Sequence, residues 1–231
     1  MQRKSTSLYI LRATAFSVAL LLSATVAHAQ ARKQMAIVET DTVPLLRGVA
    51  LSADVVGVAQ RLFGDYGQLE AGLRVNLRDR YFPVAEIGWG TADAEDVTTR
   101  LTYKTSAPYL RVGCDFNMMK NKHDDNRVYL GLRYALTSFK YDVWSPGITD
   151  PVWQETVAYE ASDVSCYYHW LEAVAGVDAK LWGPLRLGWS VRYKRRLLHD
   201  EGPLGNAWYV PGYGKQGGTR LGGSFHVIIE I

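Results

Sequence analysis

Apolar and polar residues alternate along eight segments of the chain. The segments span residues 48–56, 69–77, 82–90, 108–117, 128–137, 168–179, 185–194 and 220–231. Alternation with a period of two indicates β-strands, because successive side chains of a strand point to opposite faces. Strands of globular proteins usually have about five or six residues, whereas a tilted strand that crosses a membrane needs about 9–11. The segments have 9 to 12 residues each and therefore predict eight strands long enough to span a membrane.

The two faces of the predicted strands differ in charge and in side-chain size. One face is apolar and carries none of the Asp, Glu, Lys or Arg residues of the eight segments. The other face carries seven acidic and seven basic residues and nine glycines, whereas the apolar face has the single glycine Gly223. Ten of these charged residues are predicted to form one network: Glu70, Arg74, Glu86, Arg111, Asp115, Arg133, Glu172, Asp178, Arg186 and Arg192.

The alternation fits a soluble lipocalin-like barrel with the apolar face inside, or a membrane barrel with the charged face inside. The glycines favour the second, because the interior of an eight-stranded barrel is narrow. Balanced charge also suits an interior where each ion needs a partner. The connections have 12, 4, 17, 10, 30, 5 and 25 residues, an alternation typical of long external loops and short periplasmic turns. We predict an all-β fold, an eight-stranded antiparallel up-and-down transmembrane β-barrel over residues 48–231.

The first 29 residues are typical of a secretory signal peptide. Arg3, Lys4 and Arg12 lead into an apolar run over residues 13–26, which is shorter than the ~20 residues that a membrane-spanning helix needs. Small residues before and at Ala29 predict cleavage there, followed by a periplasmic segment over residues 30–47 and a barrel in the outer membrane. Without the signal's three basic residues the chain has 23 basic and 23 acidic residues, which removes the electrostatic case for a nucleic-acid partner.

Three segments resemble a known family. Residues 78–86, 107–115 and 129–134 are similar to a family of uncharacterised Bacteroidetes outer-membrane barrels, a domain of unknown function. The resemblance covers most of the chain after the signal peptide. It implies a location in the cell envelope and brings no activity, cofactor or catalytic residue.

One set of residues fits an enzyme that acts on lipid. Some small outer-membrane barrels act on lipid A with a catalytic His and Ser near the outer leaflet. His169 lies near the outer end of its predicted strand, and Ser162, Ser165 and the acid Glu160 precede it. The chain has no G-x-S-x-G motif, and His169 also suits the polar–aromatic interface of a membrane. We therefore predict a non-enzymatic barrel with a structural or interaction role, and keep a lipid A- or phospholipid-directed hydrolase as the alternative.

The remaining polar motifs predict no cofactor and no metal site. Residues 123–126 have ligand-type side chains without a metal-binding spacing and suit a solvated turn. Residues 212–218 are rich in glycine and predict a mobile external loop. The expected partners are outer-membrane lipid, and envelope proteins that meet the predicted loops 91–107, 138–167 and 195–219. We expect the charged side chains to plug the lumen.

The two cysteines are predicted to be free thiols. Cys114 lies near the inner end of one predicted strand and Cys166 at the outer end of another. Strand geometry separates them by roughly 20 Å or more, whereas a disulfide needs Cα atoms within about 7 Å.

Overall fold

The computed structural model describes residues 44–98, 100–149, 156–200 and 207–231, together with residues 152, 202, 204 and 205. These residues belong to one compact unit, Val43–Ile231. The predicted signal peptide, its cleavage at Ala29 and most of the predicted segment 30–47 lie outside the described residues. Within the described part, no helix is long and apolar enough to cross a membrane.

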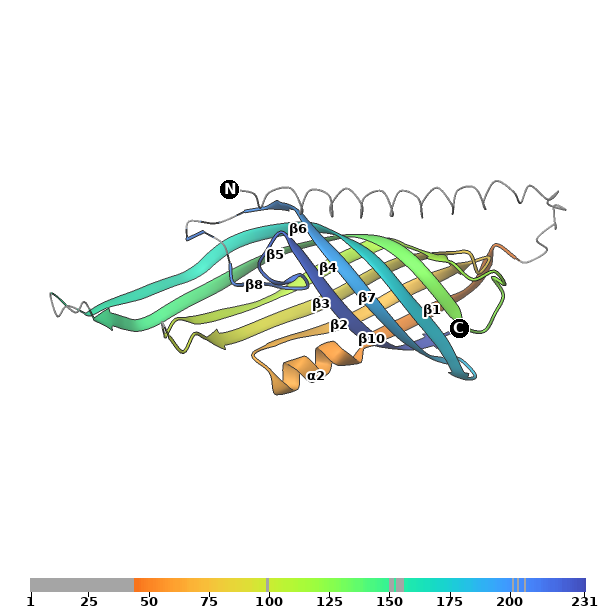
Figure 1. Ribbon diagram of the computed structural model, residues 1–231, viewed down its shortest axis with the longest axis horizontal. Coiled ribbons are helices and arrows are strands. Elements are labelled where there is room, and N and C mark those ends of the chain that lie inside the picture. The colour runs from red at the N-terminus through yellow and green to blue at the C-terminus, as the bar shows by residue number, and fades with distance from the viewer. Residues whose placement is uncertain are drawn as a thin grey trace, which may run out of the picture. The chain divides into compact units, whose positions relative to one another are not determined.

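Eight antiparallel strands close into a barrel (Figure 1). The ring runs in the order β1-β10-β7-β6-β5-β4-β3-β2, so that neighbours in the sequence are neighbours in the barrel and the first strand meets the last. This topology confirms the predicted eight-stranded up-and-down fold. The strands are β1 (Leu46–Asp54), β2 (Tyr66–Leu77), β3 (Tyr81–Glu95), β4 (Thr102–Asn117), β5 (Arg127–Thr149), β6 (Thr156–Trp182), β7 (Leu185–His199) and β10 (Thr219–Glu230).

The barrel carries its charges inside and its apolar side chains outside. Leu132 is 61% exposed on the outer surface, whereas the next residue, Arg133, is 2% exposed inside the lumen. The same alternation places Glu172 inside and Leu171 outside on β6. This orientation is the inverse of a soluble protein and agrees with the orientation predicted from the glycines.

The strands extend much further than predicted at one end of the barrel. This end, opposite Leu46 and Ile231, is called the outer end below. β5 continues to Thr149 and β6 begins at Thr156, so the predicted loop 138–167 is mostly strand. The predicted loop 91–107 is likewise reduced to residues 96–101. Alternation continues in this outer region with a different chemistry, because Phe139 and Tyr141 point inward while Lys140 and Asp142 point outward. The predicted strands ended where the side chains on the outside of the barrel stop being apolar, although β3, β4, β5 and β6 continue beyond that point.

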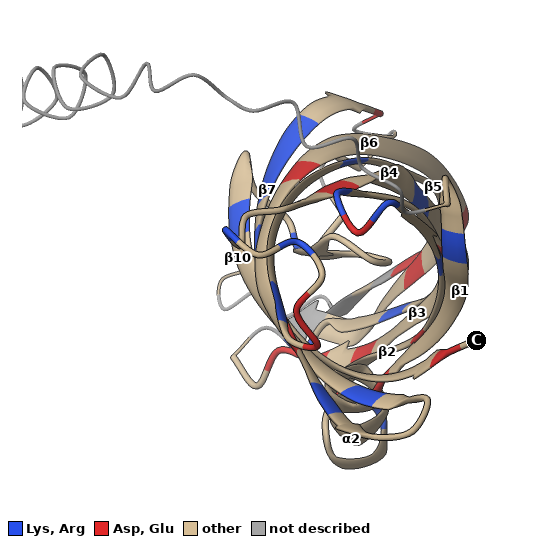
Figure 2. Ribbon diagram, turned by 90° about the vertical axis from the view of Figure 1, so that its right-hand side faces the viewer, with Lys and Arg blue, Asp and Glu red and all other residues tan. Residues whose placement is uncertain are grey.

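A helix that was not predicted follows the first strand. Helix α2 (Val55–Phe63) begins where strand 48–56 was predicted to finish, so that prediction is wrong at residues 55–56. Asp54 ends β1 and caps the helix, since its carboxylate accepts hydrogen bonds from the backbone N–H groups of Val56 and Gly57 at 3.1 and 3.2 Å. In the view along the barrel, α2 lies against the outside of the ring (Figure 2).

The last long connection contains a small hairpin that is folded into the mouth of the barrel. Strands β8 (Tyr209–Val210) and β9 (Gly214–Lys215) pair with each other and with no barrel strand of the described chain. Tyr213, between them, is only 2% exposed. The predicted loop 195–219 is therefore partly strand β7, and its glycine-rich stretch 212–218 was wrongly predicted to be a mobile external loop.

Candidate functional site

The centre of the lumen holds a network of buried ion pairs. Arg111 contacts Glu70, and its Nε lies 3.0 Å from Glu172 Oε1. Arg192 places Nη1 2.9 Å from Glu86 Oε2 and Nη2 3.0 Å from Glu70 Oε1. Since these five residues come from five strands, the ion pairs connect opposite sides of the barrel.

A second group of ion pairs continues the network toward the inner end. Arg133 Nη1 lies 2.8 Å from Glu86 Oε1, and Arg133 Nη2 lies 3.1 Å from Asp115 Oδ2. Arg74 contacts Asp178, and its Nη2 lies 3.2 Å from Asp115 Oδ2. Nine of the ten predicted network residues thus form one connected group.

Arg186 is the exception, because its Nη1 pairs with Glu230 Oε2 at 2.9 Å. Arg186 and Glu230 belong to a separate polar cluster at the inner end, around a cavity of about 260 Å³. In this cluster Arg47 and His123 both contact Asp79 in the β2–β3 turn. Burial raises the pKa of the Asp79 carboxyl, but hydrogen bonds from His123 and Asn76 and the charge of Arg47 outweigh it, so the pKa lies below its ordinary value.

His123 was predicted to lie in a solvated turn. Its Nδ1 lies 2.7 Å from Asp79 Oδ2, so the ring joins the inner cluster although it remains partly exposed. Among the described residues, no group of three His, Cys, Asp or Glu side chains is placed to hold a metal ion.

Three further side chains belong to the lumen network and were missed in the sequence. Tyr109 donates from its hydroxyl to Glu70 at 2.8 Å, and Trp170 donates from Nε1 to Glu172 at 2.7 Å. His226 Nε2 lies 3.1 Å from Arg192 Nη2. All three share the inward parity of their charged neighbours along the strand, and this parity was the signal that could have identified them.

Side chains of the barrel wall hold the hairpin in the outer mouth. Arg111 Nη2 donates to the carbonyl of Gly212 at 2.8 Å, and Lys194 Nζ donates to the same carbonyl at 2.6 Å. Tyr103 donates from its hydroxyl to the carbonyl of Tyr209 at 2.8 Å. Inward aromatic side chains surround these contacts, so the hairpin is packed as a core.

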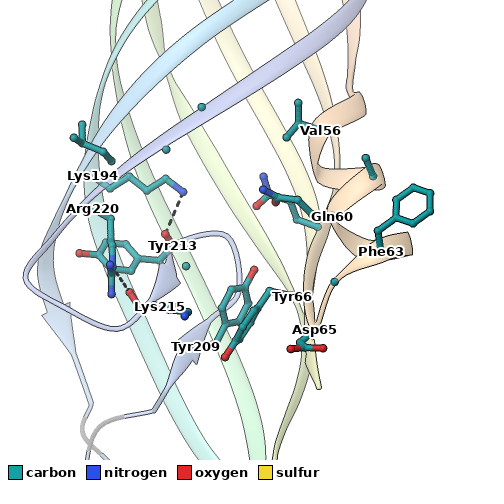
Figure 3. Close-up of a pocket in the computed structure, with 17 residues that line it drawn as sticks. Val56, Gln60, Phe63, Asp65, Tyr66, Lys194, Tyr209, Tyr213, Lys215 and Arg220 are labelled. Carbon is teal, nitrogen blue, oxygen red and sulfur yellow. Dashed lines mark hydrogen bonds between the residues drawn. The ribbon is translucent and has the colours of Figure 1, made fainter. Parts of the chain in front are cut away.

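A cavity of about 780 Å³ lies between the hairpin and helix α2 (Figure 3). Val56, Gln60 and Phe63 of α2 line one side, and Tyr209 and Lys215 of the hairpin line the other. Its charged lining residues are one acid and three bases, Asp65, Lys194, Lys215 and Arg220. The cavity therefore combines an apolar helix face with an excess of positive charge.

The residues of the hydrolase alternative lie apart on the outer half of β6. His169 Nδ1 lies 2.7 Å from the hydroxyl of Tyr134, on the neighbouring strand. Ser165 is four positions away on β6, which is about 13 Å along an extended strand, and Ser162 and Glu160 lie further out. No hydrogen bond joins His169 to either serine among the residues that the structure describes.

Cys114 and Cys166 are free thiols.

Comparison with known proteins places the chain in a family. The family model described as Domain of unknown function (DUF6048) matches residues 11–230. The chain belongs to this family. No curated protein matches it.

Two solved structures are similar to this DUF6048 protein. A major outer membrane protein from Thermus thermophilus is 16% identical, with a TM-score of 0.45 over 80% of this chain and 98% of that chain. Ail, the attachment invasion locus protein of Yersinia pestis, solved with the heparin analogue sucrose octasulfate, is 9% identical, with a TM-score of 0.37 over 79% of this chain and 93% of that chain.

Proposed function

We propose that the protein is a non-enzymatic barrel of a Gram-negative outer membrane, with a lumen that is closed to ions, and that it acts through what its outer end binds. The observation that carries the membrane location is the change of chemistry along the outside of β5. Outward residues of β5 are apolar up to Leu136 and polar from Ser138 to Asp142, while β5 itself continues as a strand to Thr149. A bilayer edge at this height accounts for that change, because only the apolar part would face lipid.

Exposed aromatic residues support the same placement. Trp89 and Tyr193 are exposed beyond the middle of β3 and β7, toward the outer end, and Tyr81 and Trp182 are exposed at the inner end. Aromatic side chains with a polar group are enriched at both interfaces of a membrane. The predicted signal peptide fits export to the outer membrane. From the resemblance to Bacteroidetes barrels, we propose that the protein comes from a bacterium of this group.

Two layers of the lumen support a closed barrel. The ion-pair network connects opposite strands across the centre, and the β8–β9 hairpin covers part of the outer mouth. An eight-stranded barrel has an interior that side chains can fill. The function is therefore assigned to the outward surfaces, where lipid and envelope partners would bind.

The closed lumen is tested by conductance. Purified full-length protein inserted into a planar lipid bilayer should give no steady ion current, with a known porin measured as the positive control. Reproducible single-channel steps from the wild-type protein would contradict the closed lumen and make transport the leading function.

The non-enzymatic role is tested with lipid substrates. Mass spectrometry of lipid A and phospholipids incubated with the purified barrel should show no loss of acyl chains. Hydrolysis that disappears in His169→Ala or Ser165→Ala would establish the hydrolase instead.

A further inference from the structure

The barrel wall lacks one strand in its outer half. β1 ends at Asp54, which pairs with His226 of β10. On the other side, the last pair between β1 and β2 is Ala53 with Ala71. β10 continues outward to Thr219 and β2 continues to Tyr66. Beyond Asp54, no strand of the described chain lies between residues 219–225 of β10 and residues 66–70 of β2.

Helix α2 takes the place of the missing strand without filling it. The helix packs on β2, because a Cβ atom built at Gly67 would meet the backbone of Arg61. Asp54 closes the lower end of the opening, since its carboxylate accepts from Phe225 N and from Gln68 Nε2, both at 3.3 Å. Above Asp54, the cavity of about 780 Å³ is lined by α2 on one side and by residues 220–223 of β10 on the other (Figure 3).

The opening lies at the height of the outer membrane interface. Register pairs Leu221 of β10 with Tyr193 in the outer half of β7, and the Tyr193 side chain is exposed on the outside. Side chains of this kind lie at the level of lipid head groups. The cavity thus faces the head groups and the upper acyl chains of the outer leaflet.

The lining of the opening is complementary to a lipid with an anionic head group. Phe63 is 90% exposed and Leu221 is 75% exposed at its apolar edge. Lys215 and Arg220 lie at its polar edge. Cations near a membrane surface attract anionic lipid by about 1 kcal/mol each.

Backbone groups of β10 also require a polar partner at the opening. Phe225 N points toward Asp54, and alternate residues of a strand direct their backbone groups to the same side. The backbone groups of Leu221 and Gly223 therefore face the opening. Backbone groups at membrane depth need hydrogen-bond partners, which the oxygens of a head group and its water can supply to the N–H groups.

We propose that this opening binds an outer-leaflet lipid that carries a phosphorylated head group. The phosphate lies beside Lys215 and Arg220, and an acyl chain lies against Phe63 and Leu221. The inference rests on the membrane location proposed above and adds a ligand to it.

Gly222 provides a variant that fills the cavity without disturbing the wall. A Cβ atom at this position would make ordinary contacts with the Lys194 side chain at 3.6 and 3.9 Å. Gly222→Leu should therefore fold and occupy part of the cavity. Gly218→Leu is the matched control, since a Cβ atom there would have no neighbour within 4 Å and Gly218 does not line the cavity.

The charge arm uses Lys215→Gln, whose matched control is Lys104→Gln. Lys104 is exposed and pairs with Asp93 on another side of the barrel mouth. Native mass spectrometry of the full chain in detergent would follow titration with phosphatidylglycerol, phosphatidylcholine and glycerol phosphate. Flotation with reconstituted vesicles would verify that every variant inserts into a membrane.

We expect phosphatidylglycerol to bind the wild-type protein more tightly than phosphatidylcholine, and glycerol phosphate to bind at least tenfold more weakly. Gly222→Leu should weaken phosphatidylglycerol binding at least tenfold, and Lys215→Gln roughly fivefold, whereas both controls bind like the wild type.

Equal phosphatidylglycerol binding by Gly222→Leu and the wild type would overturn the proposed site. Glycerol phosphate bound as tightly as phosphatidylglycerol would identify a free-phosphate site, and phosphatidylcholine bound as tightly would remove the role of the anionic head group. Failure of the wild type to float with vesicles would contradict the membrane location. Flotation without site-dependent binding would contradict the lipid site alone.

Discussion

At the scale of single residues, the arginines of the lumen are the most demanding side chains of the fold. Arg133 and Arg111 are almost completely buried, and each contacts carboxylates from more than one strand. Removing a charge from water costs several kcal/mol unless partners replace the water. Each arginine therefore stabilises the barrel only as long as its carboxylates are present.

Loss of one arginine should leave buried carboxylates with fewer cations than they need, since Glu86 would keep Arg192 and Asp115 would keep Arg74. We expect Arg133→Ala to lower the free energy of unfolding by about 3–5 kcal/mol, because Glu86 and Asp115 would both lose a cation. Lys140→Ala, which breaks the exposed pair with Asp163, is the control and should change it by less than about 1 kcal/mol. Urea unfolding in detergent micelles measures both, and equal losses would show that the network contributes no more than a surface pair.

Asp79 should make the inner end sensitive to acid. Its pKa lies below the ordinary value of about 3.9, so the folded state favours the ionised form. The stabilisation is complete above about pH 5 and is lost as the pH falls through the lowered pKa. Wild-type protein should be more stable than Asp79→Asn at pH 7, and the difference should shrink toward pH 2. A difference that stays constant over this range of unfolding measurements would contradict the ionic role.

At the scale of strands, large inward side chains lie over glycines of the neighbouring strand. Tyr109 of β4 pairs with Gly88 of β3, and Tyr129 of β5 pairs with Gly176 of β6. A Cβ atom built at either glycine would lie within 3 Å of the tyrosine ring. The excess of glycine on the charged face therefore reflects space that inward side chains occupy.

Gly88→Ala should destabilise the barrel by about 1–3 kcal/mol, because the added methyl group would collide with the Tyr109 ring. The double variant Gly88→Ala/Tyr109→Leu should lose less than the sum of its single variants, since the shortened side chain makes room. Gly218→Ala has no neighbour to meet and should be nearly neutral. Additive losses in a thermal unfolding series would show that the two positions do not interact.

Period-two alternation predicted the strands well where both faces are uniform. On β5, Leu130 and Leu132 mark an apolar face and Arg133 marks a charged face. The strand and the direction in which each face points are therefore predicted together. The outer part of β5 was missed because inward Tyr141 and outward Lys140 reverse that chemistry. Parity along the strands alone identified nine residues of the network. Arg186 also points inward but pairs with Glu230, because the carboxylate that an arginine meets depends on its depth in the barrel.

Helix α2 and the hairpin could not be derived from the same pattern. Val55 and Val56 continue a strand in sequence, and the stop depends on Asp54 turning its carboxylate to the next backbone N–H groups. The glycines around Tyr213 suggest a loose loop. The carbonyls of Gly212 and Tyr213 are held by Arg111 and Lys194, whose positions are known only once the barrel is closed.

At the scale of the whole molecule, the interior is arranged in three levels along the barrel. Polar groups around Asp79 fill the inner end, ion pairs around Glu172 fill the centre, and aromatic residues around Tyr213 fill the outer end. In the described part of the chain, a cavity opens on the side of the barrel that carries α2, which would face the bilayer in the proposed placement. With the closed lumen proposed above, the molecule would be blocked along its axis and accessible from the side.

We expect the pairing of β1 with β10, which closes the barrel, to form last during folding. Its partners run from Ala50–Glu230 to Asp54–His226, so residues 180 positions apart (230 minus 50) must meet for closure. Such contacts form slowly because the intervening chain must be ordered first. β5 and β6, in contrast, pair from Arg127–Asp178 to Thr149–Thr156. Amide hydrogens of residues 50–54 should exchange with deuterium faster than those of residues 129–136; equal protection would mean that the barrel opens as one unit and not by separation of β1 from β10.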